Sequence, residues 1–159
     1  EFPVHDIGAI KMAAPTCYDQ WFPELARLYA LNGAEFVYYP TAIGSEPTAP
    51  DFDSAAAWQT VMRGHAVANG MVIAACNRVG HENAVTFYGS SFICDPLGNI
   101  LTQASRDKDE VIDAVLKADV REQYLDLFPL LHQRRPQHYS RLLDKYEKQL
   151  DGCWKDELT

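Results

Sequence analysis

The sequence predicts an α/β or layered α+β fold, in which helices pack against a sheet. Segments with the spacing of strands alternate along the chain with segments that have the spacing of helices. Two strand-like segments, 35–39 and 71–76, are almost continuously apolar or aromatic, which is typical of strands covered on both faces. The 159 residues show no internal repeat and no linker rich in Pro, Gly or Ser. We therefore expect one domain over 1–159, with a C-terminal tail at about 140–159.

The first half of the chain is expected to alternate between strands and helices. The predicted elements are, in order, a strand over 7–14, a helix over 23–32, a strand over 35–39, a helix over 55–69 and a strand over 71–76. The strands are short apolar or aromatic runs. The first helix places Leu25, Leu28 and Tyr29 on one face, and Gly33 follows it as a stop signal. Gly70 ends the second helix in the same way.

The second half is expected to contain further strands and then polar helices. The predicted segments are, in order, a polar loop over 81–83, strands over 85–95, 100–103 and 111–116, and helices from about residue 120. The strands over 85–95 and 100–103 form a hairpin, because Pro96-Leu97-Gly98-Asn99 between them is a turn sequence. Pro129 and Pro136 interrupt the helices, since proline removes a backbone donor.

Composition and charge exclude several classes of protein. Hydrophobic residues make up 47% and charged residues 23%, close to the globular average, which excludes disordered and fibrous chains. The net charge is −8 and the isoelectric point is near 5.0. Nucleic-acid and anionic-membrane surfaces need clustered Lys and Arg, so we expect no nucleic-acid partner and no membrane partner. No apolar run approaches the roughly 18 residues of a membrane span. The negative charge suits a small cationic ligand.

The cysteines favour a reducing, cytoplasmic setting. Cys17, Cys76, Cys94 and Cys153 are too few and too scattered for a disulfide framework. No C-x-x-C pair occurs, so structural zinc is not expected. We expect neither a metal nor a cofactor.

The strongest chemical signal is the segment from Thr16 to Glu24. Here a cysteine ends a predicted strand and a helix begins a few residues later. Such a strand–turn–helix arrangement exposes a nucleophile and lets backbone N–H groups face a developing oxyanion. A small buried cysteine at the end of a strand is the alternative interpretation of Cys17 by its position alone.

The residues of this segment favour the interpretation of Cys17 as a nucleophile over that of a buried structural cysteine. Cys17-Tyr18-Asp19-Gln20-Trp21-Phe22-Pro23-Glu24 resembles the nucleophile motif of the carbon–nitrogen hydrolase (nitrilase) superfamily, and more narrowly that of N-carbamoylputrescine amidases. Further segments that resemble this family follow in the expected order, at 31–35, 39–47, 58–69, 77–80, 86–93 and 134–136. The resemblance therefore covers the chain up to about Tyr139.

The resemblance implies a fold and a mechanism. Members of the family form a four-layer α-β-β-α sandwich, and we expect this chain to form half or more of it. Their cysteine attacks an amide or carbamoyl carbon and forms a covalent thioester-type intermediate, with the help of a glutamate base and a lysine. Only Cys17 matches this set. The glutamate and lysine belong to the N-terminal half of the family's chain, so we expect 1–159 to be a partial domain corresponding to the C-terminal half.

The resemblance also implies the site residues. Cys17 is the expected nucleophile, and the backbone N–H of Tyr18 is expected to bind the oxyanion. Thr41, Ala42 and Glu46 are expected to line the substrate pocket. The Glu46 carboxylate would pair with the ammonium group at the far end of a small cationic amide or carbamoyl substrate. An ordinary solvated loop glutamate is the alternative.

Cys17 is also expected to be the most reactive thiol, at an exposed turn beside a helix N-terminus. Cys76 and Cys94 lie in strand patterns and are expected to be shielded. Cys153 lies in the polar tail, where a thiol is accessible but unactivated.

Three functions remain open at this stage. The complete enzyme would hydrolyse N-carbamoylputrescine to putrescine, carbon dioxide and ammonia, a step of polyamine biosynthesis. A second enzyme would keep the chemistry but act on an ω-amide, a β-ureido acid or a nitrile. The third is an inactive half-domain that folds and oligomerises. In each case we expect a homo-oligomer, because the predicted helices are too few to cover both faces of the sheet.

Overall fold

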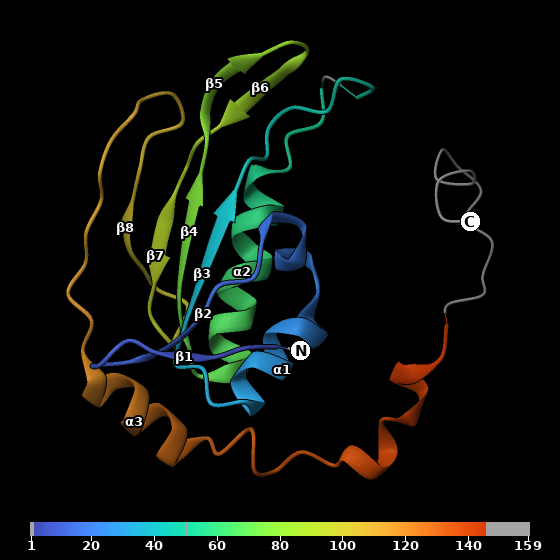
Figure 1. The fold of residues 1–159 in the computed structure, drawn as a ribbon, viewed down its shortest axis with the longest axis vertical. Helices are drawn as coiled ribbons and strands as arrows, with labels where there is room; N and C mark the ends of the chain where they lie inside the picture. Colours follow the sequence, from blue (N-terminus) through green and yellow to red (C-terminus); the bar gives the residue numbers. More distant parts are fainter. Residues whose placement is uncertain (1, 50, 146–159) are drawn as a thin grey trace.

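The computed structural model describes residues 2–49 and 51–145 and consists of a mixed sheet with helices packed against it (Figure 1). Within these ranges, the main sheet has six strands in the order β1-β2-β3-β4-β7-β8. Its strands are β1 (His5–Asp6), β2 (Lys11–Ala13), β3 (Phe36–Thr41), β4 (Val72–Asn77), β7 (Phe92–Cys94) and β8 (Ile100–Gln103). A separate hairpin pairs β5 (Val79–Glu82) with β6 (Val85–Tyr88).

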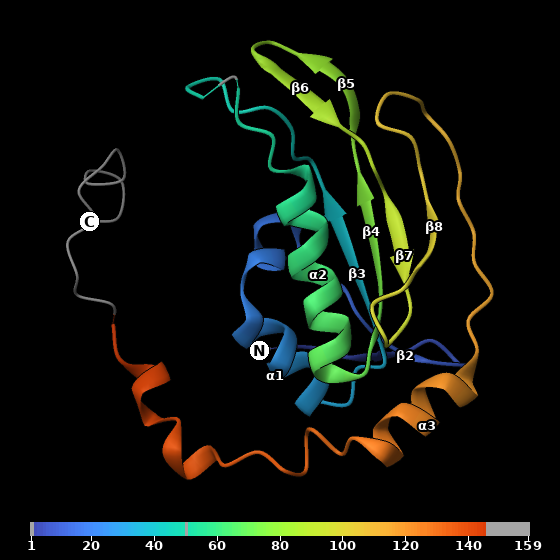
Figure 2. The same cartoon turned by 180° about the vertical axis from the view of Figure 1, so that it is seen from behind.

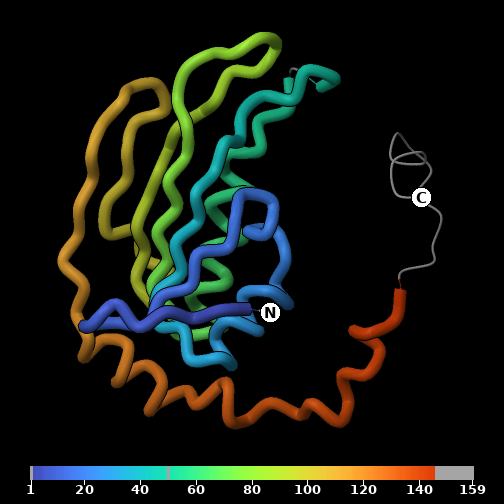
Figure 3. The backbone as a smooth tube through the Cα atoms, in the orientation of Figure 1, coloured from blue at the N-terminus to red at the C-terminus, as the bar shows by residue number. Residues whose placement is uncertain are grey.

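The helices of the described residues follow the strands along the chain. They are η1 (Cys17–Trp21, a 3₁₀-helix), α1 (Pro23–Leu31), α2 (Ala55–Asn69), α3 (Ala118–Leu127), and the 3₁₀-helices η2 (Pro136–His138) and η3 (Ser140–Leu143). Helices α1 and α2 lie on the same face of the main sheet, as the views from front and back show (Figures 1 and 2). After α3 the chain runs on away from the sheet with short helical turns (Figure 3), although Leu131 still packs against the core. No helix of the described residues is both long enough and apolar enough to cross a membrane.

Strand direction determines where the functional loops meet. Strands β2, β3 and β4 are parallel, with Ala13 beside Val37 and Val37 beside Ile73. Strands β1, β7 and β8 pair antiparallel to their neighbours. The carboxyl ends of the parallel strands therefore lie at one edge of the sheet, which is the usual place for a site in such folds.

The hydrophobic core lies between α2 and the sheet. Trp58 of α2 is fully buried and packs edge-to-face against Tyr88 and Phe92, with ring centroids 5.8 and 5.5 Å apart. Tyr39 and Met62 are also fully buried. Aromatic pairs of this kind contribute about 0.5–1.5 kcal/mol beyond the burial of their area. They fix α2 against β6 and β7.

The predicted α/β class and most of its first half are confirmed. The helices predicted over 23–32 and 55–69 are α1 and α2, and Gly70 ends α2 in a left-handed conformation with φ of 62°. The strands predicted over 35–39 and 71–76 are β3 and β4, each displaced by one or two residues.

Two predicted strands are divided in the structure. The segment 7–14 is part of a hairpin, because the chain turns at Gly8 (φ of 97°) between β1 and β2. The segment 85–95 is broken by Gly89 and Ser90, whose φ values of 50° and 60° separate β6 from β7. Strand β7 forms the predicted hairpin with β8 around Pro96–Asn99.

Two other predictions for the second half are wrong. The polar segment 81–83 is the end of β5 and its turn, where Asn83 has a φ of 53°. The segment 111–116 has no regular structure, and Val111 and Val115 are 96% and 83% exposed. Its β-branched residues suit a strand, but a strand also needs a partner edge, and no described residue pairs with this segment. Of the helices predicted beyond residue 120, α3 forms, and from its end to residue 145 the structure has only short 3₁₀ turns.

The face of the sheet opposite α1 and α2 is only partly covered by described residues. Burial alternates along β3: Val37 and Tyr39 are fully buried toward the helices, while Phe36 and Tyr38 are half-buried on the other face. The prediction that this strand is covered on both faces is therefore wrong for the residues that the structure describes.

Candidate active site

Three segments converge at the carboxyl edge of the parallel strands. The turn after β2 carries Cys17, the end of β3 carries Thr41, and the end of β4 carries Asn77. Thr41 and Asn77 are direct partners in the register of β3 and β4. This edge is the candidate active site.

Cys17 begins a strained turn of the kind expected for a nucleophile. Its φ is +43°, a region that non-glycine residues rarely occupy. Two reciprocal bonds hold the turn: the Thr16 N–H donates to Asp19 Oδ2 at 2.9 Å, and the Asp19 N–H donates to the Thr16 carbonyl at 3.0 Å. Pro15 lies beyond the end of β2, so its missing N–H costs no bond in the sheet. Cys17 is half-buried, and strain of this sort is typical of functional turns.

Gln20 connects the Cys17 turn to the predicted substrate residue Thr41. Its side chain is fully buried, and its Oε1 accepts a hydrogen bond from Thr41 Oγ1 at 3.0 Å. Its carbonyl oxygen is 2.9 Å from His65 Nε2 on α2. The Thr41 hydroxyl also lies 3.3 Å from the Tyr39 carbonyl oxygen, so it has two possible acceptors within the protein.

Asn77 fastens the loop after β3 to the rest of the sheet edge. Its Oδ1 accepts from the Ile43 N–H at 2.9 Å, and its Nδ2 donates to the carbonyls of Ile43 and Gly89 at 3.0 and 2.9 Å. Its own N–H donates to Ser91 Oγ at 2.9 Å. Sequence reasoning gave Asn77 no role. The available signal was an amide side chain placed directly after a buried apolar strand.

The other predicted site residues lie on exposed parts of the same edge. The Tyr18 ring is 65% exposed and packs edge-on against Phe22, with centroids 5.7 Å apart. Ala42 and Glu46 are exposed on the loop held by Asn77. Within the described ranges, the Glu46 carboxylate forms no ion pair, and no hydrogen bond joins it to Cys17 or Thr41. The structure thus brings the Cys17 turn and Thr41 together and leaves Glu46 on the adjoining loop.

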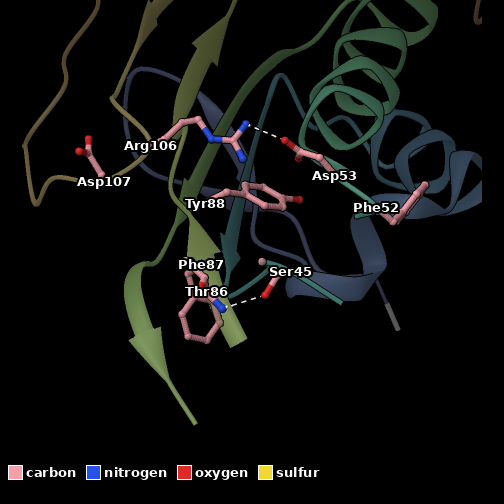
Figure 4. Close-up of a pocket in the computed structure, with 9 residues that line it drawn as sticks. Ser45, Phe52, Asp53, Thr86, Phe87, Tyr88, Arg106 and Asp107 are labelled. Carbon is pink, nitrogen blue, oxygen red and sulfur yellow. Dashed lines mark hydrogen bonds and ion pairs between the residues drawn. The ribbon is translucent and has the colours of Figure 1, made fainter. Parts of the chain in front are cut away.

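A cavity of about 330 Å³ lies between this loop and the β5–β6 hairpin (Figure 4). It is lined by Gly44, Ser45, Phe52, Asp53, Thr86, Phe87, Tyr88, Arg106 and Asp107. Arg106 pairs with Asp53 at 3.0 Å, and its guanidinium lies 5.5 Å from the centre of the Tyr88 ring. Burial raises the pKa of Tyr88 to about 12, so its hydroxyl stays neutral. The cavity therefore offers aromatic faces, carboxylates and one guanidinium.

The thiols differ from the prediction in one respect. Cys94 is fully buried, and burial raises the pKa of its thiol to about 12. Cys76 is exposed, so the prediction that it is shielded is wrong. Cys76 lies near the end of β4, directly opposite Pro40 in the register of β3 and β4. Its side chain is on the face of the sheet away from the helices. Cys153 lies outside the described residues. No group of three His, Cys, Asp or Glu side chains in the described ranges could hold a metal ion.

Comparison with known proteins confirms the resemblance found in the sequence. A family model described as carbon-nitrogen hydrolase matches residues 1–124. The chain is 44% identical over 149 residues to a citrullinase of Francisella tularensis, covering 91% of this chain and 52% of the relative. It is 40% identical over 150 residues to an N-carbamoylputrescine amidase of Arabidopsis thaliana, covering 89% and 50%.

A solved structure shows that the fold is also similar to that of a carbon-nitrogen hydrolase. The crystal structure of a carbon-nitrogen hydrolase from Helicobacter pylori G27 superposes with a TM-score of 0.80 at 38% sequence identity. The superposition covers 87% of this chain and 51% of that one. The chain thus spans about half the length of the relatives it matches.

Proposed function

The chain belongs to the carbon-nitrogen hydrolase family, and we propose that it carries the nucleophile and part of the substrate pocket of a hydrolase that cleaves the C–N bond of a small carbamoyl or amide compound. Cys17 is the proposed nucleophile. The main support for this proposal is the strained Cys17 turn. Gln20 connects this turn to the end of β3, beside the loop that carries Ala42 and Glu46, here called the pocket loop.

The proposed reaction follows from the chemistry of a thiolate. Cys17 Sγ attacks the carbamoyl carbon of R–NH–CO–NH₂, and the tetrahedral oxyanion is bound by donors that include the Tyr18 N–H. The C–N bond to the terminal amide nitrogen breaks, this nitrogen takes up the proton that the thiol gave to the base and leaves as ammonia, and a carbamoyl thioester remains. Water then releases R–NH–COOH, which decomposes to R–NH₂ and carbon dioxide. Attack requires a general base, and we assign that role to no residue of this chain.

His65 is not this base. Its Nε2 contacts a backbone carbonyl, which can only accept a hydrogen bond, so this nitrogen carries a proton and donates it. Its side chain is buried behind the Cys17 turn, with 4% of its surface exposed.

We propose a substrate with a carbamoyl group at one end and an ammonium group at the other, such as N-carbamoylputrescine. Support comes from the exposed Glu46 carboxylate on the pocket loop and from the net charge of −8. Hydrolysis would release putrescine, which would make the reaction a step of polyamine biosynthesis. The free thiols Cys17, Cys76 and Cys94 support a reducing, cytoplasmic setting.

A second substrate class is an amide or ureido compound that also carries a carboxylate, such as citrulline. The observation in its favour is Arg106, whose guanidinium lines the cavity beside Asp53. A carboxylate head group would pair with Arg106, and an α-ammonium group with Asp53 or Asp107.

The test is an ammonia-release assay with N-carbamoylputrescine and citrulline as substrates. The chain is assayed alone and mixed with a polypeptide that supplies the glutamate and lysine of the family. We expect no turnover alone and turnover in the mixture, lost on Cys17→Ala. Glu46→Gln should raise KM for N-carbamoylputrescine more than for citrulline, and Arg106→Gln should do the opposite.

Turnover in the mixture that survives Cys17→Ala contradicts the proposed nucleophile. A folded chain that gives no turnover in any mixture supports instead the half-domain that assembles without catalysis.

We also propose that the chain forms a homo-oligomer. Helices α1 and α2 cover one face of the sheet (Figure 2). On the other face Phe36, Tyr38 and Ile93 are only half-buried. A second copy that covers this face would remove apolar surface from water. Light scattering should give a mass of at least two chains at micromolar concentration, and a monodisperse monomer contradicts the proposal.

A further inference from the structure

The Cys17 turn is anchored from behind by helix α2. His65 projects from the buried face of α2, and its Nε2 lies 2.9 Å from the carbonyl oxygen of Gln20. Gln20 is in η1, the 3₁₀-helix that Cys17 begins. Since the carbonyl can only accept, the His65 Nε2–H donates this bond. It links residues 45 positions apart in the chain.

The hydrogen bond from His65 connects the turn to a distant helix, unlike the other bonds of the turn. The bonds between Thr16 and Asp19 are local and hold the shape of the turn, but they do not place it against the rest of the molecule. The bond from His65 places it against α2, which Trp58 packs onto the sheet. The side chain of the same residue, Gln20, accepts a separate bond from Thr41 at the end of β3.

The backbone of Cys17 needs such an anchor. A φ of +43° is unfavourable for any residue with a Cβ atom, and it persists only where the surroundings determine the conformation. If η1 could move away from α2, Cys17 would relax toward negative φ. Its thiol would then point elsewhere.

We propose that His65 is a positioning residue for the Cys17 nucleophile: its hydrogen bond to the Gln20 carbonyl holds η1 against α2 and so keeps Cys17 in its strained conformation. In assigning Cys17 as the nucleophile, the proposal rests on the proposed function. The anchoring itself does not depend on catalysis and can be measured without it.

The first test is a double-mutant cycle on folding stability. At a positive φ, glycine is tolerated and alanine is strained, so Cys17→Gly should have a larger folding equilibrium constant than Cys17→Ala, by a factor of about 5 to 30. With His65→Leu in the background, this ratio should fall to about one, because the turn relaxes. With His65→Gln, whose Nε2 can also donate to the Gln20 carbonyl, the ratio should return to its value in the protein that carries His65.

Asn69 provides the matched control. It lies one turn further along α2, is 2% exposed, and its Nδ2 donates to the His65 carbonyl at 2.9 Å and to no residue of η1. Asn69→Leu should lower stability without changing the ratio between Cys17→Gly and Cys17→Ala. A ratio that is unchanged in His65→Leu, or one that Asn69→Leu lowers equally, overturns the proposal.

The second test measures how reactive the Cys17 thiol is, which depends on its position. Iodoacetamide labels Cys17 and the exposed Cys76 in the same molecule, so Cys76 serves as the internal reference. The Cys17-to-Cys76 rate ratio should fall at least fivefold in folded His65→Leu and recover in His65→Gln. Equal ratios in all three proteins overturn the proposal. If Cys17 proves not to be the nucleophile, the ammonia assay fails while both of these tests still give the expected result.

Discussion

Asn77 binds both backbone groups of Ile43: its Oδ1 accepts from the Ile43 N–H at 2.9 Å, and its Nδ2 donates to the Ile43 carbonyl at 3.0 Å. One side chain therefore replaces a strand partner for the loop that carries Ala42 and Glu46. A third bond, to the Gly89 carbonyl, fixes the same amide to the base of the β5–β6 hairpin. The position of the pocket loop depends on this buried amide.

Replacing Asn77 by alanine should destabilise the fold by about 3 kcal/mol, because two half-buried backbone groups and one buried carbonyl lose their partner. Urea unfolding followed by circular dichroism measures the change. Asn99→Ala is the matched control, since its Nδ2 bonds only to the exposed Asp95 carboxylate in a surface turn, and it should cost less than about 1 kcal/mol. Equal losses in the two variants would show that Asn77 does not hold the loop.

Gly44→Ala should disturb the pocket loop. A Cβ atom at Gly44 would lie 2.3 Å from the Thr86 carbonyl oxygen and 2.8 Å from the Phe87 Cα, both backbone atoms of β6 that cannot move aside cheaply. We expect a loss of about 1–3 kcal/mol in the free energy of unfolding. Gly64→Ala is the control: its Cβ would meet no atom within 4 Å, and alanine in the interior of α2 should stabilise by up to about 1 kcal/mol. Urea unfolding should show that Gly44→Ala lowers the free energy of unfolding and that Gly64→Ala raises it. A change of the same sign in both variants contradicts the prediction.

The accessible thiols should be modified in a defined order. Iodoacetamide near neutral pH should label Cys17 and Cys76 in the folded protein, with Cys17 faster, as mass spectrometry of a time course would show. Cys94 should stay unlabelled until the protein unfolds, because it is fully buried and its pKa is raised to about 12. Labelling of Cys94 in the folded protein would contradict the packing of β7 against the core.

His65 should make stability depend on pH. Burial lowers its pKa below the ordinary value of 6.5, although the Gln20 carbonyl and the Glu24 charge oppose this shift. The unfolded chain thus binds a proton at His65 at a higher pH than the folded chain does. The free energy of unfolding should therefore fall as the pH decreases from about 6.5 through the lowered folded-state value.

The matched variant for this pH effect is His65→Gln, which keeps a donor but does not titrate. In this variant the free energy of unfolding should fall less steeply as the pH decreases below about 6.5, because the contribution of His65 is lost. The other histidines contribute equally to both proteins. Parallel curves over this range would contradict the assignment.

The sequence by itself determined the elements whose signals are local. The spacing of Leu25, Leu28 and Tyr29 and the glycines after α1 and α2 located both helices, because a helix satisfies its backbone within one segment. The nucleophile motif was found in the same way, since the turn of Cys17 is built largely from its neighbours Thr16 and Asp19.

Only the tertiary structure decided the features that depend on distant partners. Segment 111–116 looks like a strand but has no described strand beside it, and Cys76 looks buried but lies on the face that α1 and α2 leave open. The sequence places Asn77 directly after an apolar strand and His65 in a predicted helix, but neither position indicates a hydrogen-bond partner. Their partners, Ile43 and Gln20, lie 34 and 45 residues away, and a hydrogen bond over that separation exists only once the sheet and α2 have brought both ends together.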